Sequence, residues 1–308
     1  MARAYDIVGF GVVAVDDIVV VDHQPVPDMK HRMQTMQRFG GGLTATAMVA
    51  AARLGCECWW GGRFGDNALA EYSYGVFARE GIDFVRDPGR HPEAAPFHSI
   101  ITCNTEDGSR MAFFNDSAFP NFKPAEDDLK VVESARCLFV DQYAPVPQLA
   151  AAKRAREHGV PVVADIEDLG NAAARELAEM ADHLIVPLAV MCGYFNESDP
   201  AEAVRRGFGL GRKELVCVTD GMNGSWFATG AGAEVRHQQA FRVDKVVDTN
   251  GCGDVFHGVY AAFLVKGAPA AERIRRAAAA AAMKARTAGG QPGTPTMPEL
   301  DVFLREYS

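Results

Sequence analysis

The chain has 308 residues, of which 48% are hydrophobic and 23% are charged, as expected of a globular protein long enough for one α/β domain. Its formal net charge of -9 argues against nucleic acid as a partner, and no apolar run approaches the ~20 residues that a membrane span requires. The N-terminus shows no signal-peptide pattern, and the seven cysteines are odd in number and scattered. We therefore expect a cytoplasmic protein that binds neither nucleic acid nor a membrane.

The first strand is expected near residues 6–13, and its glycines raise the question of a dinucleotide site. Gly9, Gly11 and Ala14 match the pattern GxGxxA. In a dinucleotide-binding protein this pattern opens a helix, whereas residues 15–22 are rich in β-branched side chains and predict a strand. The sequence therefore argues against a dehydrogenase.

Two segments in the first third of the chain have a mixed polar and apolar pattern that predicts a small separate sheet. The first spans about residues 16–39 and the second about residues 97–116. Within the second segment, Asp107-Gly108 lies between two strand-like runs and predicts a hairpin turn. We expect both segments to be antiparallel-type insertions that form this small sheet, with one face over a cleft.

From about residue 135 the pattern becomes regular, because short apolar strands alternate with helical segments. This alternation is typical of βαβ units and predicts a mostly parallel sheet with helices on both faces. Strands are expected at 137–140, 160–164, 183–186 and 215–219, and helices at 146–158, 172–180, 200–210, 268–288 and 297–307.

Residues 248–254 read Asp-Thr-Asn-Gly-Cys-Gly-Asp and lead directly into a helical run. Gly251 and Gly253 let the backbone turn tightly, and the free N–H groups of the following helix form a site for an anion such as a phosphate. Asp254 at that site is suited to take a proton from an attacking hydroxyl. The plainer interpretation is that Asp254 is only a helix cap and the glycines only a turn.

The longer string Asp-Thr-x-Gly-x-Gly-Asp closely resembles the C-terminal signature of the ribokinase (PfkB) family of carbohydrate kinases, with Cys252 where alanine is usual. The glycines at 40–42 and the end Ala-Arg-Leu-Gly at 52–55 resemble the N-terminal signature of the same family, with Thr46 in place of the usual asparagine. The resemblance implies a ribokinase-like three-layer α/β/α domain over residues 1–308. Its central sheet would be mostly parallel, with the two early segments forming a small β lid.

The resemblance also implies a role for several residues. In the catalytic group, Asp254 is the base, and the N–H groups of Gly251, Cys252 and Gly253 stabilise the transferred phosphoryl group. The substrate-binding residues are Asp16, Gly41, Gly42, Thr46, Lys30 and Asn115, with Arg110 as a further lid candidate. The residues expected to bind ATP are Thr219, Gly221, Gly224, Asp248 and Thr249, of which the last two line the triphosphate and its Mg²⁺.

Some of these positions have plainer interpretations. Asp16 at a strand end can also be a turn residue or a solvated charge, and Lys30 and Arg110 can equally be solvated lid charges. The family's Asn-x-x-Glu motif, which helps to order Mg²⁺, is absent from residues 186–191, so no metal ligand is assigned. His257 lies one turn into the helix after Asp254 and is expected to be a packed helix residue.

The resemblance predicts an ATP-dependent kinase that phosphorylates a hydroxymethyl group of a sugar or sugar derivative. The strings at 40–47 and 254–258 look most like the sulfofructose kinase-like branch, which favours a ketohexose-type substrate. The alternatives are a nucleoside kinase of adenosine type, with Phe113 and Phe114 as an aromatic clamp, and a non-catalytic binding or regulatory protein. Because lid strands in this family often pair between subunits, we also expect a homodimer.

Overall fold

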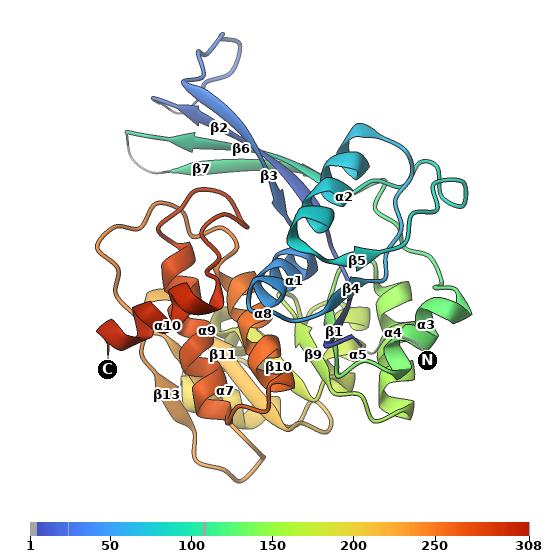
Figure 1. Cartoon of the computed structure of the whole chain (residues 1–308). Coiled ribbons are helices and arrows are strands. Elements are labelled where there is room, and N and C mark those ends of the chain that lie inside the picture. Colours follow the sequence, from blue (N-terminus) through green and yellow to red (C-terminus); the bar gives the residue numbers. More distant parts are fainter. Residues whose placement is uncertain (1–4, 24, 107–108, 308) are drawn as a thin grey trace.

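The computed structural model describes residues 5–23, 25–106 and 109–307, and its main element is a nine-stranded sheet in the order β13-β12-β11-β10-β9-β8-β1-β4-β5 (Figure 1). The strands from β5 to β11 pair in parallel, and β12 and β13 pair antiparallel at one edge. Their bounds are β1 (Ile7–Phe10), β4 (Cys58–Trp60), β5 (Asp83–Phe84), β8 (Cys137–Asp141), β9 (Val162–Asp165), β10 (His183–Pro187), β11 (Leu215–Thr219), β12 (Ser225–Ala228) and β13 (Arg236–Gln238).

Helices cover both faces of this sheet, and each face has its own hydrophobic core. Along β8, Cys137 and Phe139 belong to one core, whereas Leu138 and Val140 belong to the other, as the two-residue period of a strand requires. The first layer holds α1 (Leu43–Arg53), α2 (Ala68–Glu80), α8 (Cys252–Val265), α9 (Ala270–Lys284) and α10 (Met297–Glu306). The second holds α3 (Glu126–Glu133), α4 (Pro145–Glu157), α5 (Ala172–Met180), α6 (Leu188–Phe195) and α7 (Pro200–Gly207). The three-layer prediction is confirmed.

Helices α1 and α8 pack backbone against backbone. A Cβ atom added at Gly258 of α8 would lie 2.1 Å from the carbonyl oxygen of Ala47 in α1. The small residues of α1 are buried from Thr44 to Ala51, which allows this close approach. Each of the two helices begins directly after a glycine-rich loop, so their contact fixes the two loops relative to each other.

A second sheet, in the order β3-β2-β6-β7, projects from the main body and forms the lid (Figure 1). Its strands are β2 (Ala14–Val21), β3 (Thr35–Gly41), β6 (Phe97–Asn104) and β7 (Arg110–Asn115). The hairpins β2–β3 and β6–β7 are antiparallel as expected, but β2 and β6 join them in parallel, so this sheet is mixed. The turn predicted at Asp107-Gly108 lies outside the described residues.

The extended stretch after residue 9 is a strand and not a helix, which agrees with the rejection of a dinucleotide site. All seven cysteines are free. In the part of the chain that the structure describes, no helix combines the length and the apolar character needed to cross a membrane.

Candidate active site

The loop before α8 forms an anion cradle. Gly251 has φ of 79°, and a Cβ atom there would lie 2.4 Å from the carbonyl oxygen of Gly290, so only glycine fits. The helix begins where the N–H of Val255 donates to the Gly251 carbonyl at 2.9 Å. Among the described residues, the N–H groups of Gly253 and Asp254 donate no hydrogen bond. These free N–H groups at a helix N-terminus suit a phosphate oxygen.

The cradle differs in one respect from the sequence-based expectation. The Cys252 N–H donates to the carbonyl of Thr249 at 3.2 Å and closes a turn, so it is already engaged. Gly253, by contrast, is exposed, and a Cβ atom there would meet nothing within 4 Å. The open space beside Gly253 is therefore where a phosphate group fits, and Cys252 contributes to the shape of the turn.

The Asp254 carboxyl group lies half-buried at this cradle, in a strongly acidic environment. Burial, together with the neighbouring carboxylates of Asp165 and Glu167, raises the pKa of Asp254 well above its ordinary value, and the nearby His257 acts in the opposite direction. A carboxylate with a raised pKa is a stronger base than an ordinary aspartate. The environment thus suits Asp254 for accepting a proton from an alcohol.

Sequence reasoning missed the acidic neighbours of Asp254. Asp141 ends β8, Asp165 ends β9, and Glu167 follows two residues later. The signal that could have found them is position, because ligands of α/β proteins bind at the carboxyl ends of parallel strands. Asp141 has a structural role: it is fully buried and accepts hydrogen bonds from the Val12 N–H at 2.6 Å and the Thr44 hydroxyl at 2.7 Å.

Asp248 connects the cradle loop to its surroundings. Its Oδ1 atom accepts hydrogen bonds from the Asn250 N–H at 2.9 Å and from Nη1 of Arg110 at 2.8 Å, and its Oδ2 atom accepts from the Gly289 N–H at 2.9 Å. The backbone carbonyl of Asp248 accepts from Nζ of Lys284 at 3.0 Å. Lys284 is fully buried, and sequence reasoning also missed it. Because α9 carries this lysine, the loop is held by a buried amino group, whose pKa burial lowers below its ordinary value.

The lid strand β7 contacts the same loop. Nη2 of Arg110 donates to the Thr249 hydroxyl at 3.3 Å, beside the ion pair with Asp248. The structure thus brings together Arg110, Asp248 and Thr249, which the sequence had assigned separately to the lid and to the nucleotide. The lid and the anion cradle meet at this contact.

Asp16 faces the site from β2 and is buried. Burial raises the pKa of its carboxyl group, and the side chains of Ser99 and Asn250 act in the opposite direction. A Cβ atom at Gly41 would lie 2.2 Å from Oδ2 of Asp16, so the glycine leaves room for this carboxylate. Gly42 has φ of 91° and starts α1. Asp16 and the glycine loop therefore form one surface next to Asn250.

Three other predicted substrate residues are placed differently. Thr46 is fully buried in α1, and its hydroxyl has no hydrogen-bond partner among the described residues. Lys30 is exposed on the connection between β2 and β3. Asn115 ends β7 opposite His98, on the lid face that Asp16 does not share, and its Oδ1 atom accepts from the Ser117 N–H at 3.0 Å. The structure does not bring Lys30 and Asn115 next to Asp16.

The predicted nucleotide loop follows β11. Thr219 ends this strand, and a short 3-10 helix covers Gly221–Asn223. Gly221 has φ of 48° and open space at its Cβ position, whereas a Cβ atom at Gly224 would lie 2.1 Å from the Gln238 carbonyl. Gly221 therefore borders open space beside the loop, and Gly224 is required by the packing of β13.

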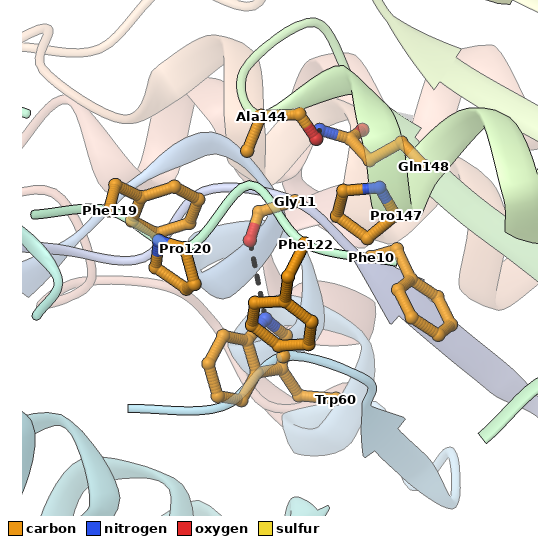
Figure 2. Close-up of a pocket in the computed structure, with 10 residues that line it drawn as sticks. Phe10, Gly11, Trp60, Phe119, Pro120, Phe122, Ala144, Pro147 and Gln148 are labelled. Atoms are coloured by element: carbon orange, nitrogen blue, oxygen red, sulfur yellow. Dashed lines mark hydrogen bonds between the residues drawn. The ribbon is translucent and has the colours of Figure 1, made fainter. Parts of the chain in front are cut away.

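Figure 2 shows an apolar pocket beside the first strand of the sheet, where Trp60 donates from Nε1 to the Gly11 carbonyl at 3.3 Å. Phe119 and Phe122 from the segment after the lid, and Pro147 from α4, complete its wall. Its volume is about 10 Å³, enough for roughly one water molecule. This pocket has no room for a substrate.

The described residues contain no group of three or more His, Cys, Asp or Glu side chains arranged to hold a metal ion. Mg²⁺ keeps several water ligands and takes oxygens from phosphates, so a kinase needs only one or two protein carboxylates near it. The open cradle next to Asp248 fits a magnesium nucleotide on these terms.

An anion cradle, an adjacent carboxylate base and a lid together define a phosphoryl-transfer enzyme acting on an alcohol. The chain belongs to the pfkB family of carbohydrate kinases, whose family model matches residues 6–297. It is therefore a sugar or nucleoside kinase of that family.

Known relatives cover the whole fold. The chain is 25% identical to a ribokinase from Arabidopsis thaliana over 96% of this chain and 79% of the relative. It is 22% identical to a ketohexokinase from Mus musculus over 86% of this chain and 91% of the relative. The solved structure of the Arabidopsis thaliana ribokinase complexed with ribose and ATP superposes with a TM-score of 0.81, at 23% identity and with 98% and 99% of the two chains covered. The ribokinase-like fold prediction is confirmed.

Proposed function

We propose that the protein transfers the γ-phosphoryl group of ATP to a hydroxymethyl group of a sugar, with a ketohexose-type sugar as the first candidate. One observation carries this proposal: the Asp254 carboxyl group and the free N–H groups of Gly253 and Asp254 lie at the same place, the start of α8. In this proposal the whole chain, residues 1–308, acts as one kinase domain, and the lid segments at about 16–39 and 97–116 are inserted into it.

In the proposed mechanism, the hydroxymethyl group approaches the cradle from the side of Asp16. The Asp16 carboxylate accepts hydrogen bonds from neighbouring sugar hydroxyls. Asp254 takes the proton of the attacking hydroxyl, and the N–H groups of Gly253 and Asp254 stabilise the negative charge on the transferred group. The lid excludes water, which would otherwise accept the phosphoryl group.

ATP and Mg²⁺ are the proposed cofactors. Asp248 and Thr249 lie at the edge of the cradle, where the triphosphate would pass, and Mg²⁺ supplies neutralising charge between the phosphates. Exposed apolar side chains occur in both segments predicted to bind the nucleotide: Met222 in the loop after β11 is 90% exposed, and Val246 and Val247, which precede Asp248 in the chain, are 59% and 49% exposed. Such a surface suits the flat face of an adenine.

A ketohexose is favoured by the strings at 40–47 and 254–258, and the similarity to a ketohexokinase supports this class. One observation favours a nucleoside as the second candidate. Phe114 pairs with Ser99, which in turn pairs with Asp16, so its ring lies on the substrate face of the lid, where it is 67% exposed. A nucleoside base could stack there, whereas Phe113 points to the other face.

The test is an assay of ATP consumption and phosphorylated product with a panel of ketohexoses, pentoses, ketose phosphates and nucleosides. We expect turnover with a ketohexose-type sugar and a loss of most kcat in Asp254→Asn, because the amide cannot accept the proton. Thermal unfolding of the variant should resemble that of the wild type. Wild-type kcat in Asp254→Asn would contradict the role of Asp254, and turnover of nucleosides alone would select the second candidate.

We also propose that the protein forms a homodimer through the outer face of the lid. This face carries Met36, Ile100, Met111 and Phe113, which are between 39% and 59% exposed. The strand register places all four on the side opposite Asp16. A second copy of the same face would cover these side chains, and every residue of the edge strand β7 is exposed.

A further inference from the structure

His257 lies in α8, one helical turn after Gly253 and close to Asp254, the proposed base. Its side chain is 4% exposed, and its ring meets Phe139 of β8 edge to face. The sequence predicted a packed helix histidine, and the residue is indeed packed. Its two nitrogen atoms, however, both lie next to backbone carbonyl oxygens.

Each ring nitrogen of His257 faces an oxygen atom of a backbone carbonyl. Nδ1 lies 2.8 Å from the Gly253 carbonyl and 3.3 Å from Oδ2 of Asp165, and Nε2 lies 3.1 Å from the Ile185 carbonyl. A carbonyl oxygen only accepts hydrogen bonds. A neutral imidazole has a single N–H group, so one of its nitrogens would direct a lone pair at a carbonyl lone pair. Only the doubly protonated ring satisfies both contacts.

We infer that His257 is a positively charged positioning residue: its ring holds a proton on both nitrogens, and its charge keeps the Asp254 carboxylate ionised. The inference rests on the proposed role of Asp254 as the base. His257 does not give up or receive a proton during the reaction. The proton of the alcohol passes to Asp254, and the imidazolium remains paired with Asp165.

The charges around the ring make this role necessary. The groups that face His257 and the base are Asp254 on α8, Asp165 on β9, Glu167 in the following loop and Asp141 on β8, while β10 offers only the Ile185 carbonyl. Without a cation among them, burial and mutual repulsion would favour a protonated Asp254 that cannot act as a base. Burial lowers the pKa of His257 below its ordinary value, and its hydrogen bonds to the two carbonyl groups and the nearby carboxylates oppose this shift only in part. The two carbonyl contacts of the ring, and not this direction, carry the inference.

A second buried histidine provides an internal comparison. His183 lies at the start of β10, at the end of α8 that is far from the cradle. The Tyr260 hydroxyl accepts a hydrogen bond from Nη1 of Arg273 at 3.0 Å and lies 3.1 Å from Nδ1 of His183, to which it is free to donate its proton. Nε2 of His183 lies 3.6 Å from Oε2 of Glu214. Burial and the charge of Arg273 lower the pKa of His183 to about 3. This ring is neutral for a visible reason, and it contacts the same helix.

The first test is NMR of the full-length protein with ¹⁵N-labelled histidine, which reports the protonation of each ring nitrogen. We expect His257 to show two protonated nitrogens from pH 6 to 8, and His183 to show one. His257→Gln and His183→Gln identify the two signals. A neutral His257 ring at pH 7 would overturn the inference even if the protein is an active kinase.

The second test is the pH dependence of kcat/KM in the same variants. Loss of the positive charge raises the pKa of Asp254, so the acidic limb of His257→Gln should move upward by about one to three pH units. The activity loss would then be large at pH 6 and small at pH 9. In His183→Gln we expect the limb to stay in place. An equal loss of activity at every pH in His257→Gln would show a purely structural role and would overturn the inference. Asp254→Asn, which tests the proposed function itself, should be inactive at all pH values.

Discussion

At the scale of single residues, the site depends on glycines, because the absence of a side chain leaves space for neighbouring groups. Gly41 leaves the space that the Asp16 carboxylate occupies, and Gly253 leaves the open space of the cradle. Gly251 combines a left-handed backbone with close contact to the Gly290 carbonyl. A side chain at Gly41 or Gly251 would move a neighbouring group without removing it, whereas one at Gly253 would occupy the open space of the cradle.

Gly41→Ala tests this idea at the acceptor side. The added methyl group would lie 2.2 Å from Oδ2 of Asp16, so the carboxylate must move away from the sugar hydroxyls. A hydrogen bond to a charged group is worth about 1.5 to 3 kcal/mol, so we expect kcat/KM for the sugar to fall roughly ten- to a hundredfold, with KM for ATP unchanged. Steady-state kinetics with each substrate varied in turn measures both values.

Gly193→Ala is the matched control for this substitution. Gly193 lies in α6, has an ordinary helical backbone, and has open space at its Cβ position. We expect this variant to keep wild-type kinetics and to gain a little stability, about 1 kcal/mol at most. If Gly41→Ala behaves like Gly193→Ala, then Asp16 does not bind the sugar.

At the scale of elements, the lid and the cradle loop are joined through β7. Arg110 spans two residues of the loop, Asp248 and Thr249, with its two Nη atoms. The Arg110 side chain is 43% exposed, so solvent weakens the ion pair, and its contribution is about 0.2 to 1 kcal/mol. This energy is small enough for the contact to open and close during turnover.

Arg110→Gln should therefore shift the lid toward the open position. We expect KM for the sugar to rise by up to about fivefold and the ratio of hydrolysed ATP to phosphorylated sugar to increase, because water enters more often. Product analysis alongside ATP consumption measures this ratio. Arg110→Lys keeps the charge but cannot bridge both partners, so it should be intermediate. An unchanged ratio in both variants would mean that the contact does not control the lid.

The sequence predicted the elements well where the information is local. The alternation after residue 135 and the two glycine signatures depend on neighbouring residues, and both correspond to the helices, strands and loops observed. The parallel pairing of β2 with β6 was not predicted, because it joins strands about eighty residues apart. The grouping of Asp165 and Glu167 near Asp254 was missed for the same reason: only the folded sheet brings them together.

At the scale of the whole molecule, the two faces of the lid differ in the side chains that they carry. The inner face carries Asp16, Ser99, Phe114 and Arg110, and the outer face carries the apolar side chains of the proposed dimer interface. Because successive residues of a strand point to opposite faces, one short strand such as β7 would contact both the substrate and the partner subunit in the proposed dimer. Association would then also stiffen the lid over the substrate.

Phe113→Asp tests this arrangement, because a charge on the outer face should separate the two subunits. We expect light scattering after size-exclusion chromatography to show a dimer for the wild type and a monomer for Phe113→Asp. Ala112→Asp, on the neighbouring residue of the same strand, places the charge on the inner face and should leave the dimer intact. A monomeric wild type, or equal dissociation in both variants, would contradict the proposed interface.

The close contact between Gly258 and Ala47 fixes the distance between the starts of α1 and α8. In the proposed mechanism, the sugar binds at the loop before α1 and the phosphate at the loop before α8, so this contact would set the distance between the two reactants. A methyl group inserted there would touch neither reactant, yet it would push the two half-sites apart. A misplacement of about 1 Å can reduce a reaction rate a hundredfold. The rate of phosphoryl transfer would therefore depend on the packing of α1 against α8, one helical turn away from Asp254.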